Sequence, residues 1–112
     1  MTITNPQLHD YPFLALMYRD SYYPDALVDK GAAILRRLCE QIEAERPTSH
    51  EEVYRLTHAA TEAFNELAKE FTAQGSDIET VARDTIATDV EFLLKAYGFD
   101  LDLEEALAPR DW

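Results

Sequence analysis

Apolar side chains recur every three or four residues along nearly the whole chain, and this spacing constrains the fold more than any other feature of the sequence. It is typical of helices that bury one face, because an α-helix completes a turn in about 3.6 residues. The three glycines and five prolines fall at the ends of the periodic segments, with the exception of Gly31. These two residue types interrupt regular structure. The pattern therefore predicts an all-α protein.

Three long helices are predicted, at about residues 24–45, 49–74 and 77–97, with a short helix toward each end of the chain. Helices of this kind are stable when they bury their apolar stripes against one another. No repeat, low-complexity run or linker divides the sequence. We therefore expect residues 1–112 to form a single helical domain, a compact bundle of three long helices and two short ones.

Capping residues define the predicted boundaries. Capping boxes open at Ser49 and Ser76, where a serine and a glutamate three residues later satisfy free amide groups of the first turn. Because Ser76 directly follows Gly75, the second and third long helices are expected to form a tight antiparallel hairpin. The short N-terminal helix is expected to begin at Asp10, and the short C-terminal helix to follow Asp102.

The chain is strongly acidic. Its 112 residues include 22 acidic and 10 basic side chains, which gives a formal net charge of −12 at pH 7. Nucleic acids and anionic membrane surfaces attract Lys and Arg, so direct binding to either is not expected. Residues 57–112 carry four basic and thirteen acidic side chains, whereas residues 1–56 carry six and nine. On electrostatic grounds we expect a basic partner protein that contacts the C-terminal half of the chain.

The sequence predicts a folded protein of the cytoplasm. Its 46% apolar and 11% aromatic residues can offset the entropy lost on folding, which distinguishes it from acidic disordered chains. Residues 1–6 lack the basic start and apolar run of a signal peptide. No stretch approaches the roughly 20 apolar residues of a membrane span. The single cysteine, Cys39, lies on an apolar helix face and is expected to be a small buried residue.

One carboxylate stands out on the predicted helix 77–97. On a helical wheel Asp89 falls in the middle of the apolar face, with Thr85 one turn earlier as its nearest candidate partner. Burying a carboxylate costs several kcal/mol unless it is hydrogen-bonded or protonated. Asp89 could fix the packing by bonding a Tyr, an Arg or the backbone, or it could bind a ligand or act in catalysis. A tilted helix that leaves it exposed is the third possibility.

A line of uncharged polar side chains follows one margin of the buried face of the helix 49–74, and includes His58, Thr61 and Asn65. Such a margin faces either a neighbouring helix or a groove. Glu62 lies one turn beyond His58, so the pair could hold a metal ion if Asp89 and one further ligand converged on it. No repeated metal-binding motif supports this site.

These residues define a second hypothesis, a ligand- or metal-binding helical enzyme with a polar pocket between the second and third long helices. The sequence has no glycine-rich phosphate loop, no paired-cysteine motif and no nucleophilic serine motif, and no cofactor is expected. The candidate ligand-binding side chains are Asp89, His58, Thr85, Arg83 and Asn65.

Candidate partner-binding residues lie on two segments. Glu62, Glu66 and Glu70 place like charges along one helix face, an arrangement that is unfavourable in an isolated helix and attracts basic groups. Five aromatic residues lie between positions 11 and 23; most are expected in the core, with one or both of the adjacent pair Tyr22 and Tyr23 left for a partner or a groove. Tyrosine is common both in cores and at protein interfaces.

Several stretches of the sequence are distinctive when taken together: residues 17–24 with 27–30, 56–65, 78–83, 96–99 and 110–112. With these stretches the chain resembles a family of small, acidic, all-helical bacterial proteins of uncharacterised function. The resemblance spans nearly the whole chain and is most specific around His58 and at the closing Arg-Asp-Trp. It implies a bacterial, single-domain helical protein and supplies no catalytic residues.

The sequence therefore favours a non-enzymatic interaction or regulatory module, of the inhibitor or immunity type, that binds a basic protein through acidic helix faces. The alternative is the ligand- or metal-binding enzyme with a polar pocket around Asp89 and His58. The sequence leaves the oligomeric state open.

Overall fold

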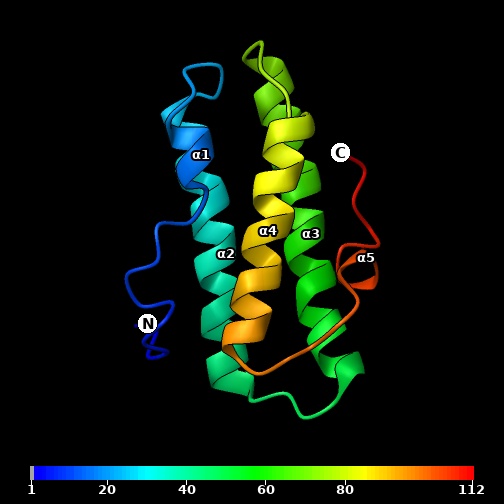
Figure 1. Ribbon diagram of the computed structural model, residues 1–112. Coiled ribbons are helices and arrows are strands. Elements are labelled where there is room, and N and C mark those ends of the chain that lie inside the picture. Colours follow the sequence, from blue (N-terminus) through cyan, green and yellow to red (C-terminus); the bar gives the residue numbers. More distant parts are fainter. Residues whose placement is uncertain (1) are drawn as a thin grey trace.

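The computed structural model describes residues 2–112, and every regular element within them is a helix (Figure 1). The predicted all-α architecture of three long helices with short helices toward both ends is confirmed. None of the helices in this part of the chain is long and apolar enough to cross a membrane. The helices are α1 (Ala15–Tyr18), α2 (Asp25–Glu45), α3 (His50–Ala73), α4 (Thr80–Ala96) and α5 (Leu103–Ala106).

The caps explain where the helices begin, and one predicted cap is wrong. Ser49 precedes α3 and its hydroxyl oxygen accepts the Glu52 backbone N–H at 3.2 Å, as predicted. Asp102 likewise caps α5. Ser76, by contrast, does not cap α4, because its hydroxyl donates to the Tyr22 carbonyl at 2.8 Å. α4 begins only at Thr80, with Glu79 as its N-cap.

The N-terminal helix is shorter than predicted. Asp10 does not cap it, since residues 6–10 form turns and α1 has only four residues, beginning at Ala15. Leu14, the residue before it, has a φ of 61°, in the left-handed region that costs a bulky side chain energy. This backbone turn sends the side chains of Phe13 and Leu14 into the core, where both are buried.

The helices form two layers. α2 and α3 pack side by side as antiparallel neighbours in one layer. α1 and α4 form the second layer, which packs against the first (Figure 1). The second and third long helices run antiparallel, as predicted, but the hairpin is not tight (Figure 1). Among the helices of residues 2–112, α4 has its close backbone neighbours in α1, α2 and α5 and not in α3. The two helices are joined by residues 74–79, which are not helical, rather than by a direct turn at Gly75.

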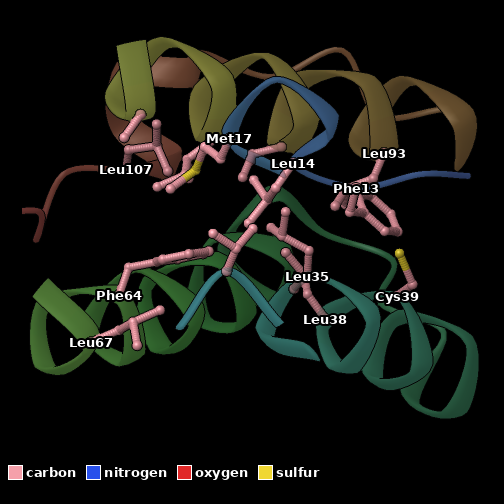
Figure 2. Packing of buried hydrophobic residues seen from close by; sticks show 14 of the residues in the cluster. Phe13, Leu14, Met17, Leu35, Leu38, Cys39, Phe64, Leu67, Leu93 and Leu107 are labelled. Carbon is pink, nitrogen blue, oxygen red and sulfur yellow. The ribbon is translucent and has the colours of Figure 1, made fainter. Parts of the chain in front are cut away.

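The core lies between the two layers. Figure 2 shows Phe13, Leu14 and Leu93 opposite Leu35 and Leu38 of α2. The predicted apolar stripe of α2 is buried as expected; it consists of Leu27, Val28, Gly31, Leu35, Leu38, Cys39 and Ile42.

Gly31 allows the two layers to approach each other closely. A Cβ atom at this position would lie 2.8 Å from Leu14 Cδ1 and 3.3 Å from Phe64 Cε1. The interpretation of Gly31 as a point of close packing is confirmed. Cys39 is also buried, and its burial raises the pKa of the thiol to about 12, so it is a poor nucleophile.

Candidate functional site

Asp89 is buried, with 5% of its surface exposed, as its place on the apolar face of α4 predicted. The hypothesis of a tilted helix with an exposed Asp89 is therefore wrong. The Leu14 backbone N–H donates to Oδ2 at 2.7 Å, and the Tyr11 hydroxyl donates to Oδ1 at 3.1 Å. Thr85 is not its partner, because the Thr85 hydroxyl donates to the Val81 carbonyl at 2.7 Å. Asp89 thus ties the N-terminal segment to α4.

The environment of Asp89 makes this carboxyl harder to ionise than an exposed aspartate. Burial raises the pKa of this carboxyl, and the hydrogen bonds from Leu14 and Tyr11 lower it only in part. The pKa of Tyr11 is raised by its own burial and by the neighbouring Asp89 charge. Within residues 2–112, no basic side chain forms an ion pair with Asp89. The carboxylate is therefore hydrogen-bonded but not neutralised by a cation of the described chain.

Asp89 lies in the wall of an open groove of about 420 Å³ between α4 and the segment that leads into α1. This volume is in the range of sites that bind small molecules or single side chains. The groove has apolar and polar walls: Pro12, Ala15, Leu16 and Val81 supply the apolar surface, and Tyr11, Asp84, Thr85, Thr88 and Asp89 the polar groups.

Two of the large apolar side chains in the groove are exposed to solvent. Leu16 and Val81 line the groove and are 55% and 45% exposed. The other large apolar side chains that are exposed within residues 2–112 are Tyr18 and Tyr22, on the segment that follows Leu16 in the chain. Leu16 and Val81 thus place exposed apolar surface in the groove, next to its polar groups.

The polar margin of α3 has a different role. His58 Nε2 lies 2.7 Å from the Glu105 carbonyl, and the Asn65 side-chain amide donates to the Pro109 carbonyl at 3.0 Å. Trp112 packs edge-on against Phe64, with ring centroids 6.0 Å apart. The margin therefore faces a neighbouring helix, as one of the two predicted alternatives had it: it lies against α5 and the residues that follow, and it holds them through backbone carbonyls.

The predicted polar pocket of Asp89 and His58 is not assembled. His58 and Asn65 contact the C-terminal segment, whereas Asp89 contacts the N-terminal one, and only Asp89 and Thr85 line the groove. Arg83 is exposed and does not line it. Across residues 2–112, no group of three or more His, Cys, Asp or Glu side chains is arranged to hold a metal ion, so the suggested metal site of His58 and Glu62 is not formed.

Some of the candidate partner-binding residues are free to contact another protein, and others already bond to side chains of this chain. Glu62 and Tyr22 are exposed. Glu66 and Glu70 are exposed but paired, with Lys69 at 3.0 Å and Lys30 at 2.6 Å. Tyr23 is not available to a partner, because only 1% of its surface is exposed and its hydroxyl donates to Glu79.

Sequence reasoning missed a second carboxylate that holds the N-terminal segment. Glu43 of α2 accepts four hydrogen bonds, from the backbone N–H and hydroxyl of Thr4, the backbone N–H of Asn5, and the Tyr97 hydroxyl. The largest influence on its pKa is desolvation, which raises it, but the hydrogen bonds together lower the pKa of Glu43 to about 2. Nothing in the local sequence indicates that residues 4 and 97 meet at position 43.

Sequence reasoning also missed most of the groove. A signal for it exists on α4, where Asp84 and Thr88, and Thr85 and Asp89, are each separated by four residues and so share one helix face. The opposite wall comes from Tyr11 and Leu16, and depends on the left-handed turn before α1. That turn has no recognisable sequence signature, because the residue there is a leucine rather than a glycine.

The fold and the groove define a small all-helical bundle protein with a buried carboxylate in the wall of an open groove. Residues 7–112 match the model of a family of unknown function (DUF5713), and the chain belongs to this family. The predicted resemblance to a helical family of uncharacterised function is thus confirmed. Neither a curated protein nor a solved structure matches the chain.

Proposed function

We propose that this protein is a non-catalytic regulatory module, of the inhibitor or immunity type, whose α1–α4 groove receives an apolar, positively charged segment of a basic partner protein. The observation that carries the proposal is the composition of the groove. Its exposed apolar residues, Leu16 and Val81, lie beside Asp84 and Asp89, and no basic side chain of residues 2–112 pairs with either carboxylate.

The charge of the surrounding surface supports the same partner. Residues 57–112 carry thirteen acidic and four basic side chains, and this excess attracts a basic protein from a distance. Glu62 adds to this field, whereas Glu66 and Glu70 contribute less because lysines already pair with them. Tyr22 extends the exposed apolar surface beyond the groove. Such a complex forms quickly and weakens as salt screens the charges.

The test is a comparison of matched variants in capture from a lysate of the source organism. Leu16→Arg puts a positive charge into the groove, and Ala59→Arg puts the same charge on an exposed position of α3 outside it. We expect the wild type and Ala59→Arg to retain one stoichiometric basic protein that a salt gradient releases, and Leu16→Arg to lose it. Retention by both variants, or a partner released only by detergent, would contradict the proposal.

A second candidate function is the binding of a small molecule in the same groove, because its volume of about 420 Å³ suits one. It retains Asp89 and Thr85 from the predicted polar pocket and omits His58. Native mass spectrometry of the protein purified from its own source tests it. A metabolite that remains bound to the wild type and is lost from Leu16→Arg would favour this function over the partner protein.

A further inference from the structure

The hydrogen bonds in the groove leave two of its hydroxyl groups able only to accept. The Tyr11 hydroxyl donates its proton to Asp89, and the Thr85 hydroxyl donates its proton to the Val81 carbonyl. Both hydroxyl oxygens keep lone pairs but have no proton left to offer. The Asp84 and Asp89 carboxylates are acceptors when ionised, so that only the Thr88 hydroxyl can also donate. Acceptors therefore outnumber donors among the polar groups of the groove, which suits a ligand that brings donors.

Asp89 in particular has unused capacity. An ionised carboxylate offers about four lone-pair positions, and Leu14 and Tyr11 occupy two of those on Asp89. Glu43, in comparison, accepts four hydrogen bonds although it is less buried. A buried carboxylate with few donors and no cation gains more from a charged donor than an exposed one does.

The apolar wall of the groove indicates which kind of side chain should bring the hydrogen-bond donors. Ala15, Leu16 and Val81 lie beside the acceptors, and a chain of methylene groups would cover them. Lysine has this form, a flexible apolar stem that ends in a compact ammonium group with three donors. A guanidinium group is a wide planar fork that needs both oxygens of a carboxylate from one side, and Leu14 and Tyr11 already bond to one oxygen each.

From this arrangement we infer that the groove is a lysine-binding site, in which Asp84 and Asp89 hold the ammonium group of a partner's lysine and Leu16 and Val81 pack against its methylene groups. The inference rests on the proposed function, since it names the residue that the partner inserts. Thr85 and Tyr11 complete the site as neutral acceptors.

The first experiment uses n-hexylamine as a probe of the lysine side chain, with hexanol, hexanoate and hexyltrimethylammonium as comparisons. Binding is followed by NMR at low ionic strength through the Leu16 and Val81 methyl signals and the Thr88 amide. We expect saturable shifts with hexylamine and binding about tenfold weaker for hexanol, because a charged donor is worth about 1.4 kcal/mol more. Hexyltrimethylammonium, which has no N–H donor, should also bind more weakly. Equal binding of hexanoate or hexanol would overturn the inference.

Variants of the carboxylates give the second measurement. Asp84→Asn keeps the shape of an exposed side chain and should raise the Kd for hexylamine about threefold, whereas Asp77→Asn, an exposed acid outside the groove, should leave it unchanged. Asp89→Asn should have a larger effect where the variant folds. Equal affinities in Asp84→Asn and Asp77→Asn would overturn the assignment of the ammonium site.

The two hypotheses fail separately. If hexylamine does not bind but Leu16→Arg still loses the partner, the lysine site is wrong and the binding module stands. If hexylamine binds while Leu16→Arg and Ala59→Arg retain the partner equally, the proposed function is wrong. Acetylation of the partner's lysines should abolish capture, and an acetylated partner that still binds would show that the ammonium group does not come from its lysines.

Discussion

Asp89 and Glu43 both hold the N-terminal segment against the bundle, and they do so under opposite physical conditions. Glu43 is half-buried and accepts four hydrogen bonds, and its pKa is lowered to about 2. Asp89 is buried and accepts two, and burial raises its pKa. The hydrogen-bonding capacity of Glu43 is thus used within the protein, and its role is structural. Asp89 stabilises the same segment but keeps acceptor capacity in the wall of a groove, which is a property of binding sites.

Removing each carboxylate tests this difference, and we expect the largest effect at Asp89. Asp89→Ala should lower the free energy of unfolding by about 1–3 kcal/mol, because the Leu14 N–H and the Tyr11 hydroxyl lose their acceptor in the interior. Glu43→Ala should cost about 1 kcal/mol, since water can reach the donors that it leaves. Urea denaturation measures both. A stabilised Asp89→Ala would show that relief of the buried charge outweighs the lost bonds.

Gly31→Ala tests how firmly Asp89 fixes Leu14. The added Cβ would lie 2.8 Å from Leu14 Cδ1, so Leu14 must move. We expect a loss of about 1–2 kcal/mol from overpacking, even though alanine is the better helix former by about 1 kcal/mol. The loss should be smaller in an Asp89→Asn background, where the Leu14 N–H is held less strongly. Equal losses in the two backgrounds, measured by urea denaturation, would show that Asp89 does not restrain Leu14.

The pH dependence of stability should have opposite signs at the two carboxylates. The pKa of Glu43 is depressed in the folded state, so its contribution is present above pH 4.5 and is lost as the pH falls toward about 2. Allowing for solvent screening, this contribution is about 1 kcal/mol. The pKa of Asp89 is raised above 3.8, so its contribution is present below that pH and is lost as the pH rises through the folded-state pKa.

Denaturation from acid to neutral pH checks both signs. Relative to the wild type, Glu43→Gln should lose its stability deficit as the pH falls. Asp89→Asn should be at its greatest disadvantage in acid, where the wild-type carboxyl is protonated. If the two variants change in the same direction with pH, the contrast between the carboxylates is wrong.

The smallest effect on stability is expected for the exposed wall of the groove. Leu16→Ser and Val81→Ser should each change the free energy of unfolding by less than about 0.5 kcal/mol, because these side chains are about half exposed. Both should weaken hexylamine binding in the NMR titration. A loss of stability as large as that of Asp89→Ala would show that the groove wall belongs to the core.

Helix periodicity was sufficient for the fold class, for the three long helices and for two residues of the groove, Asp89 and Thr85. It predicted the buried stripe of α2 and the burial of Asp89, because both depend only on which face of a helix is apolar. The predicted caps at Ser76 and Asp10 are wrong. The Ser76 hydroxyl bonds to the distant Tyr22 carbonyl, and Asp10 lies in a series of turns rather than at the start of a helix. A helical wheel also does not show which segment of the chain covers a given helix face. For this reason His58 and Asp89 were predicted to share one polar pocket, although different segments cover them.

The order of folding follows from the bonds of Asp89 and its neighbours. α2 and α3 are adjacent in sequence and close a short loop, whereas the Leu14–Asp89 bond spans 75 positions and the Asn5–Ala96 bond spans 91. Long loops cost more entropy to close, so the N-terminal segment is expected to dock after the long helices have packed. Hydrogen exchange at the Leu14 amide should then be faster than in α3. Because this docking step creates one wall of the groove, an incompletely folded chain would have no site to offer, and only mature molecules would compete for the partner.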